Sequence, residues 1–307
     1  MSANSRFRDG LRTPFFSNFK RKTEPYAFIS PTLILLLVLM VIPVGLVIKY
    51  SFFSNVIVDK FPRFIGFENY INIVKDEAFR TSLVNTFVFT VISVVAHLLI
   101  GLTFASLLNS SLISNFSKSL FRMIYILPWL FTVAIIAILW RMILNPNGVL
   151  NYIITSLHLS DTPIEWLSNE KTALLAVTFI NIWAGYPFYM TSILAGLQGI
   201  PKDLYEAAKV DGASGFQQFV NVTLPQLKPI IISMSMLDLI WTSQQFALIW
   251  MTTGGGPMTS TEMLGTYTYK LAFSQYQFSQ AATSAVVLFL LSMILAFFYV
   301  RNQKVRD

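Results

Sequence analysis

The residues best suited to chemistry lie on one face of a predicted helix within the apolar stretch 226–252. They follow one another at intervals of three and four residues, which share one side of an α-helix, and they are Ser235, Asp238, Trp241, Thr242 and Gln245. A carboxylate, a hydroxyl and an amide beside an indole ring can bind a sugar through its hydroxyls and apolar ring faces. An ionised carboxylate in hydrocarbon costs roughly 2.5 to 3.5 kcal/mol, so we expect Asp238 to face water, a partner or a ligand.

A second lining is predicted in the apolar stretch 172–197. Its candidate residues are Asn181, Trp183, Gly185, Tyr186, Pro187, Phe188 and Tyr189. Structural alternatives stay open: the aromatic rings can simply pack between helices, Thr242 can bond its own helix, and Gln245 can link neighbouring spans. His97 is interpreted as a hydrogen-bonded packing residue rather than a proton carrier.

A polar loop, residues 198–225, interrupts the apolar chain and is expected to meet another protein. Pro201 suits a first helical turn, a short helix is predicted over 204–210, and Gly212 stands where a left-handed stop is needed. Ala207 and Ala208 allow close contact, and Glu206 offers a carboxylate to a cationic partner. The alternative is an ordinary amphipathic loop between membrane helices.

Composition places these elements in a membrane. Hydrophobic residues make up 54% of the chain and charged residues 12%, against roughly a quarter charged in soluble domains. The predicted fold is all-α with six transmembrane helices between polar tails at 1–25 and 303–307, and the spans are about 26–53, 83–108, 120–144, 172–197, 226–252 and 281–300.

The same sequence bounds the chemistry and the orientation. Cysteine is absent, which excludes thiolate sites, and no Gly-x-x-x-x-Gly-Lys-Ser/Thr phosphate loop occurs, so ATP use would belong to a partner. No basic stripe with interleaved aromatics indicates nucleic-acid binding. Segments on the side of the N-terminus hold fourteen lysines and arginines against six on the other side, which predicts cytoplasmic termini and a cytoplasmic polar loop.

Three motifs carry a family resemblance. The polar loop has the Glu-Ala-Ala, Gly and Ile-x-Leu-Pro pattern, with Val222 in place of Ile; Phe121 to Trp129 holds an Arg, Leu-Pro, Trp series followed by Asn145-Pro-x-Gly; and Thr253-Gly-Gly-Gly-Pro257 precedes Thr261-Glu262. The chain resembles the permease subunits of binding-protein-dependent ABC importers for carbohydrates, especially the maltose-type half. It lacks that permease's two extra N-terminal spans and large external domain, so it is more similar to the short six-span relatives.

The resemblance implies roles for two groups of residues. Residues that would couple the permease to an ATPase, through what we call the coupling loop (residues 198–225), are Glu206, Ala207, Ala208, Asp211, Gly212, Leu224 and Pro225. Residues that would contact the substrate are Gly185, Tyr186, Phe188, Asp238, Trp241, Thr242 and Gln245. No metal site is expected.

The resemblance also implies a multi-subunit importer in a bacterial or archaeal inner membrane. Its partners would be a second, dissimilar permease, two copies of an ABC ATPase that uses ATP and Mg, and an external solute-binding protein that delivers a sugar or oligosaccharide. This chain would not be an enzyme. An ABC permease for glycerol phosphate remains open, as does a self-sufficient ion-coupled transporter, although we find no convincing inverted repeat or ion site.

Overall fold

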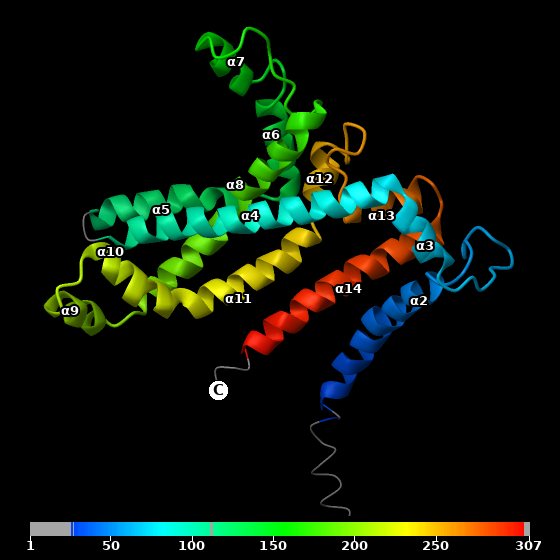
Figure 1. Ribbon diagram of the computed structural model, residues 1–307, viewed down its shortest axis with the longest axis horizontal. Helices are drawn as coiled ribbons and strands as arrows, with labels where there is room; N and C mark the ends of the chain where they lie inside the picture. The colour runs from blue at the N-terminus through cyan, green and yellow to red at the C-terminus, as the bar shows by residue number, and fades with distance from the viewer. Residues whose placement is uncertain (1–25, 27, 111–112, 304–307) are drawn as a thin grey trace, which may run out of the picture.

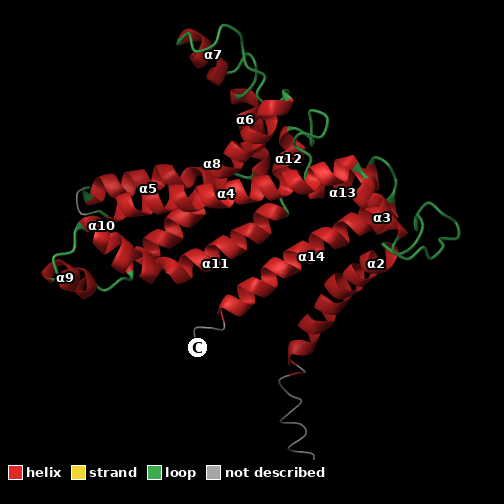
Figure 2. Cartoon of the chain, viewed as in Figure 1, coloured by secondary structure: helices red, strands yellow, loops and turns green. Residues whose placement is uncertain are grey.

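The computed structural model describes residue 26 and residues 28–110 and 113–303. These residues form helices connected by loops (Figure 1). The predicted tail at 1–25 lies outside the described residues, as do residues 304–307. Figure 2 shows no strand in the described part of the chain. The elements are η1 (Leu37–Val41), α2 (Ile42–Tyr50), α3 (Glu68–Lys75), α4 (Glu77–Asn109), α5 (Asn115–Leu130), α6 (Val133–Ile143), α7 (Val149–Ser156), α8 (Glu170–Gln198), α9 (Lys202–Val210), α10 (Gly215–Gln218), η2 (Phe219–Thr223), α11 (Leu224–Ser243), α12 (Ala247–Thr252), α13 (Leu264–Phe273) and α14 (Phe278–Gln303).

Four described helices are long and apolar enough to cross a membrane. They are Phe28–Tyr50, α4, α8 and Phe278–Arg301, and the bent pair α5–α6 gives a fifth if it is counted as one span. The most apolar window of Phe28–Tyr50 buries none of its residues within this chain. Its side chains are therefore available to lipid or to another subunit.

The predicted span 120–144 is not one straight helix. α5 ends at Leu130, and the extended backbone of Phe131 and Thr132 leads into α6 at an angle of 99° to α5. The Thr132 hydroxyl accepts a hydrogen bond from the Ile135 amide, so a new helix begins there. Apolar composition alone did not predict this bend, because the two arms together are long and apolar enough to read as one span.

The predicted span 226–252 also differs from expectation. α11 ends at Ser243, and α12 begins only at Ala247. α11 is not among the crossing-length apolar helices, because its lysine, prolines and polar stripe lower its mean hydropathy. The same polar residues that indicate a site therefore weaken the signal for a span.

Helices α4 and α8 pack tightly through two reciprocal glycine contacts. His97 of α4 lies over Gly185 of α8, and Tyr189 of α8 lies over Gly101 of α4; a Cβ atom on either glycine would overlap the facing residue. Small residues at these positions let the two backbones approach closely. The pairing fixes where the His97 side chain can stand.

A buried apolar cluster continues this packing toward the coupling loop. It joins α4, α8 and α11 and contains Ala105, Leu108, Tyr189, Met190, Ile193, Leu194, Leu197, Ile200, Leu227 and Met234. In Figure 1, α9 and α10 lie at the end of α11 where α4 leads into α5, whereas α3 and α13 lie at the other end of α4. The cluster therefore connects the helices that carry the predicted substrate residues to the coupling loop.

Candidate functional site

A cavity of about 300 Å³ lies where α4, α8 and α11 meet the bend between α5 and α6. Its lining combines polar groups from three helices with aromatic rings, and consists of His97, Pro128, Trp129, Phe131, Val133, Ile136, Asn181, Ala184, Gly185, Asp238, Trp241, Thr242 and Gln245. Trp129 and Trp241 are 52% and 60% exposed, so the cavity opens on the surface of this chain. Polar atoms beside flat apolar rings match the chemistry of a saccharide.

Asp238 is the centre of a buried hydrogen-bond network. Its Oδ2 atom lies 2.8 Å from His97 Nδ1, and its Oδ1 atom accepts a bond of 2.8 Å from the Thr242 hydroxyl. His97 Nε2 lies 3.0 Å from the main-chain oxygen of Asn181. Both carboxylate oxygens therefore have partners, and the intramembrane carboxylate does not meet hydrocarbon unpaired.

Asn181 and Gln245 extend this network along the cavity. The Gln245 amide donates a long hydrogen bond of 3.4 Å to the Asn181 side-chain oxygen. Asn181 Nδ2 is buried without a hydrogen-bond partner among the described residues. Because an unpaired buried donor costs free energy, this amide would be stabilised by a hydrogen-bond partner.

Five of the seven predicted substrate residues line the cavity, namely Gly185, Asp238, Trp241, Thr242 and Gln245. Tyr186 and Phe188 do not. The Tyr186 hydroxyl donates to the Tyr125 main-chain oxygen at 3.0 Å, away from the cavity, and the Phe188 ring packs against Trp241 and Trp129 at 5.7 and 6.2 Å between centroids. Phe188 therefore supports the aromatic wall and does not form it.

The sequence-based site set omitted His97 and Trp129. His97 is the hydrogen-bonded residue that the sequence indicated, but its partner is Asp238 itself. A histidine and an aspartate both cost free energy inside apolar spans. This shared cost was the signal in the sequence that could have predicted their pairing. Trp129 enters the cavity because the chain turns just after it.

The coupling loop has the backbone that its sequence predicts. Gly212 adopts a left-handed φ of +78°, and the Ala213 amide donates back to the Ala208 carbonyl at 2.9 Å, which closes α9 in a Schellman arrangement. α10 follows, capped by the reciprocal bonds of Ser214 and Gln217. A second short helix thus follows the left-handed stop.

α9 is held at one point and otherwise exposed. The Tyr205 hydroxyl lies 2.9 Å from the Thr223 hydroxyl, at the start of α11, and no residue of α9 is buried. The predicted coupling residues Glu206, Ala207, Asp211 and Gly212 are exposed, Pro225 is exposed, and Ala208 and Leu224 are half-buried. α9 therefore presents most of its surface outside the fold and is tied to the start of α11 by a side-chain hydrogen bond.

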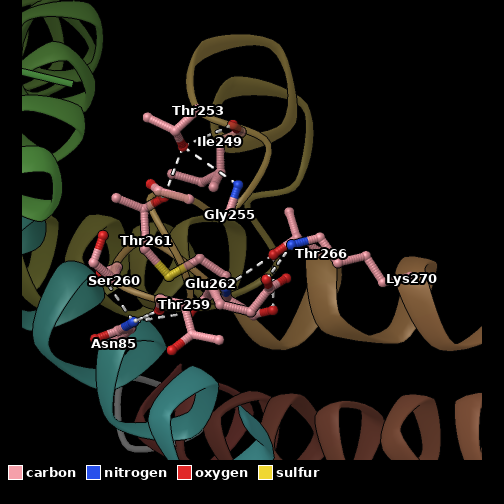
Figure 3. Close-up of polar contacts among 12 residues, drawn as sticks. Asn85, Ile249, Thr253, Gly255, Thr259, Ser260, Thr261, Glu262, Thr266 and Lys270 are labelled. Atoms are coloured by element: carbon pink, nitrogen blue, oxygen red, sulfur yellow. Dashed lines mark hydrogen bonds and ion pairs between the residues drawn. The ribbon is translucent and has the colours of Figure 1, made fainter. Parts of the chain in front are cut away.

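The segment 253–262, which we call the glycine loop, is pinned rather than flexible (Figure 3). The Asn85 amide of α4 donates to the main-chain oxygens of Thr259, Ser260 and Glu262, each at 3.1 Å. Buried Glu262 pairs with Lys270 of α13, and a Cβ atom on Gly255 would overlap the Glu262 carboxylate. Gly255 thus permits close packing around this carboxylate.

The hydroxyl of Tyr267 in α13 has a raised pKa. Burial is the largest cause, and the hydrogen bond to Asp76 is the second. Among the described residues, no group of three His, Cys, Asp or Glu side chains could hold a metal ion.

Comparisons with known proteins agree with this architecture. Residues 97–305 match the family described as "Binding-protein-dependent transport system inner membrane component". The chain is 34% identical to the trehalose/maltose transport system permease protein MalF of Thermococcus litoralis, over 89% of this chain and 90% of the relative. It is 34% identical to the sulfoquinovosyl glycerol transport system permease protein SmoG of Agrobacterium fabrum, over 91% and 90%.

A solved structure has the same fold. It is a bacterial ABC transporter involved in the import of the acidic polysaccharide alginate, with a TM-score of 0.81, 22% identity and coverage of 96% of this chain and 100% of that chain. This likeness extends to nearly every described helix. From the family match over two thirds of its length and the relatives aligned over about nine-tenths, this chain belongs to the binding-protein-dependent ABC transporter permeases, and it is a multi-pass inner-membrane transport component and not the ATPase.

Proposed function

We propose that this permease carries a sugar or oligosaccharide through the cavity around Asp238. The observation that supports this most directly is the lining itself, in which Asp238, Thr242 and Asn181 stand beside Trp129 and Trp241. Sugars require this combination, because their hydroxyls need hydrogen bonds and their ring faces favour flat apolar contact. The relatives named for trehalose/maltose and for sulfoquinovosyl glycerol favour the same substrate class.

The rest of the importer follows from the exposed surfaces. The cavity opens beside Trp241, so a second, dissimilar permease would cover it, and an external solute-binding protein would deliver the substrate. The exposed α9 would dock on one of two ATPase copies, which use ATP and Mg. We place six crossings in the membrane, with α11–α12 as the fifth, and both termini on the cytoplasmic side with α9.

Coupling would work through α9 as a lever. The Tyr205–Thr223 hydrogen bond ties α9 to the start of α11, and α11 carries Asp238 at its far end. Closure of the ATPases would therefore displace the helix that forms one side of the cavity. ATP hydrolysis would reset it.

The test is ATP-driven uptake of radiolabelled saccharides by the complete complex in proteoliposomes. Thr242→Ala removes the hydrogen bond that its hydroxyl donates to the Asp238 carboxylate, worth about 1.5 to 3 kcal/mol because the acceptor is charged, so uptake should fall by about tenfold to a hundredfold while assembly is unchanged. Exposed Thr162→Ala is the matched control. Uptake by this chain alone down an ion gradient, with no need for ATP, would contradict the proposal.

A further inference from the structure

We infer that this cavity takes an uncharged saccharide, and that His97 determines this preference by neutralising Asp238. The inference rests on the proposed function and narrows its substrate class. It concerns a residue pair from two different helices, α4 and α11, that are 141 positions apart in the sequence. The preference would follow from the protons that the pair holds, from the charge of the other residues that line the cavity, and from the hydrogen-bonding groups that stay free.

The hydrogen bonds of His97 and Asp238 determine how many protons the pair holds. A main-chain carbonyl oxygen can only accept, so the 3.0 Å contact of His97 Nε2 with Asn181 O requires a hydrogen on Nε2. The 2.8 Å contact of Nδ1 with Asp238 Oδ2 requires one more hydrogen between those two atoms. If that hydrogen is on nitrogen, the pair is imidazolium and carboxylate; if it is on oxygen, the pair is imidazole and carboxylic acid. The net charge is zero in both cases.

The neutrality of the pair matters because both side chains are buried. The His97 and Asp238 side chains are only 3% and 10% exposed, so water does little to screen an unbalanced charge there. Gly185 contributes by leaving room for the ring, because a Cβ atom at that position would overlap His97. The His97 ring is therefore built into the contact between α4 and α8, and it reaches Asp238 of α11 from there.

The other residues of this chain that line the cavity carry no charge. No lysine, arginine or second carboxylate occurs among the described residues that line the cavity. Proteins bind phosphate, sulfonate or carboxylate groups with guanidinium, ammonium or clustered amide donors. The residues of this chain that line the cavity offer none of the charged groups, so an anionic sugar or glycerol phosphate would find no counter-ion among them.

Asn181 and Asp238 keep hydrogen-bonding capacity that the hydroxyl groups of a sugar could use. Asn181 Nδ2 has no partner among the described residues, and each Asp238 oxygen uses one of its two acceptor positions. A sugar hydroxyl both donates and accepts, so it can donate to a free acceptor position of Asp238 and accept from another group of the lining. The comparisons leave the charge of the substrate open, because one relative is named for trehalose/maltose and the similar structure imports an acidic polysaccharide.

The first experiment is a double-mutant cycle on uptake by the reconstituted complex. His97→Gln leaves the carboxylate without a cation and should reduce uptake by about tenfold to a hundredfold. Asp238→Asn stays neutral, since its amide can donate to Nδ1 of a neutral His97, and should reduce uptake less. The double variant His97→Gln/Asp238→Asn is neutral again and should stay within about threefold of Asp238→Asn.

The control is the other histidine of the chain. His158 is exposed, and His158→Gln should leave uptake unchanged. If the uptake losses of the two single variants multiply in the double variant, the inference is overturned. The two residues would then act independently and would not balance each other's charge. If His97→Gln fails to assemble, recovered assembly of the double variant supports the inference, and continued failure contradicts it.

The second experiment measures directly which charge of sugar the cavity prefers, and it omits the binding protein. Saturation-transfer difference NMR of the complex in lipid nanodiscs would compare methyl glucoside, glucuronate and glucosamine, which share one ring and differ in charge. The signal lost in Ala184→Trp, which fills the cavity, defines cavity binding. In the wild type we expect methyl glucoside to give the strongest cavity signal. In His97→Gln the unpaired carboxylate should raise glucosamine about fivefold relative to methyl glucoside.

The outcomes separate this inference from the proposed function. A strongest wild-type signal from glucuronate, an unchanged order in His97→Gln, or no cavity signal from any probe would overturn the inference while saccharide uptake still stands. Absence of ATP-driven uptake of any saccharide by the complete complex would instead overturn the proposed function.

Discussion

Gly185→Ala provides a test in which the local sequence and the tertiary contact predict opposite signs. Gly185 lies inside α8, where alanine is favoured over glycine by roughly 1 kcal/mol. The new methyl group would lie 3.1 Å from His97 Cδ2 and closer still to Nε2 and Cε1. The ring would have to move, and it is held by Asp238 on one side and by the Asn181 carbonyl on the other.

The expected magnitude follows from these opposing contributions. Overpacking costs about 1 to 3 kcal/mol, and a weakened charge-assisted hydrogen bond to Asp238 adds about 1.5 to 3 kcal/mol. After the gain in helix propensity of about 1 kcal/mol, we expect a net loss of roughly 1.5 to 5 kcal/mol. Uptake should fall as well, because Asp238 loses its neutralising partner.

The assay is thermal unfolding of the purified complex, followed by size-exclusion chromatography of this subunit, together with saccharide uptake. Gly45→Ala is the matched control, since Gly45 lies in α2 with no atom within 4 Å of a built Cβ atom, and it should be neutral or slightly stabilising. His97→Ala removes the ring, so adding Gly185→Ala to it should cost little. If Gly185→Ala is as stable and active as Gly45→Ala, the argument for close contact at His97 is wrong.

Three further predictions concern the loops. Gly212→Val forces a β-branched residue into the left-handed region at φ +78°, at a cost of about 1 to 3 kcal/mol, and should uncouple ATP hydrolysis from uptake, whereas Gly215→Ala should not; normal uptake by both would exclude the coupling role. Asn85→Ala leaves three main-chain oxygens without their donor and should lower stability by about 1 to 3 kcal/mol and open the glycine loop to limited proteolysis; unchanged protease resistance would contradict the pinning. Since the chain has no cysteine, Val210→Cys should resist an impermeant thiol reagent in intact cells and Met258→Cys, 80% exposed, should react; the reverse pattern would overturn the orientation.

Local sequence predicted those features that depend on short-range physics. The left-handed stop at Gly212 and the short helix before it follow from residues a few positions apart. Helices α4 and α8 follow from their apolar length. The one-sided stripe on α11 placed Asp238, Trp241 and Thr242 on the cavity, because a spacing of three and four residues fixes a helix face wherever the helix lies.

What only the tertiary structure decided is how separate helices meet. The bend between α5 and α6 brings Trp129 to the cavity, and no local pattern distinguished that bend from a straight span. The role of Gly185 depends on the ring that faces it from α4, and the direction of Tyr186 depends on α5. The state of Asp238 depends on His97, 141 residues away: a sequence can show that a buried carboxylate needs a partner, but only packing across helices determines which residue reaches it.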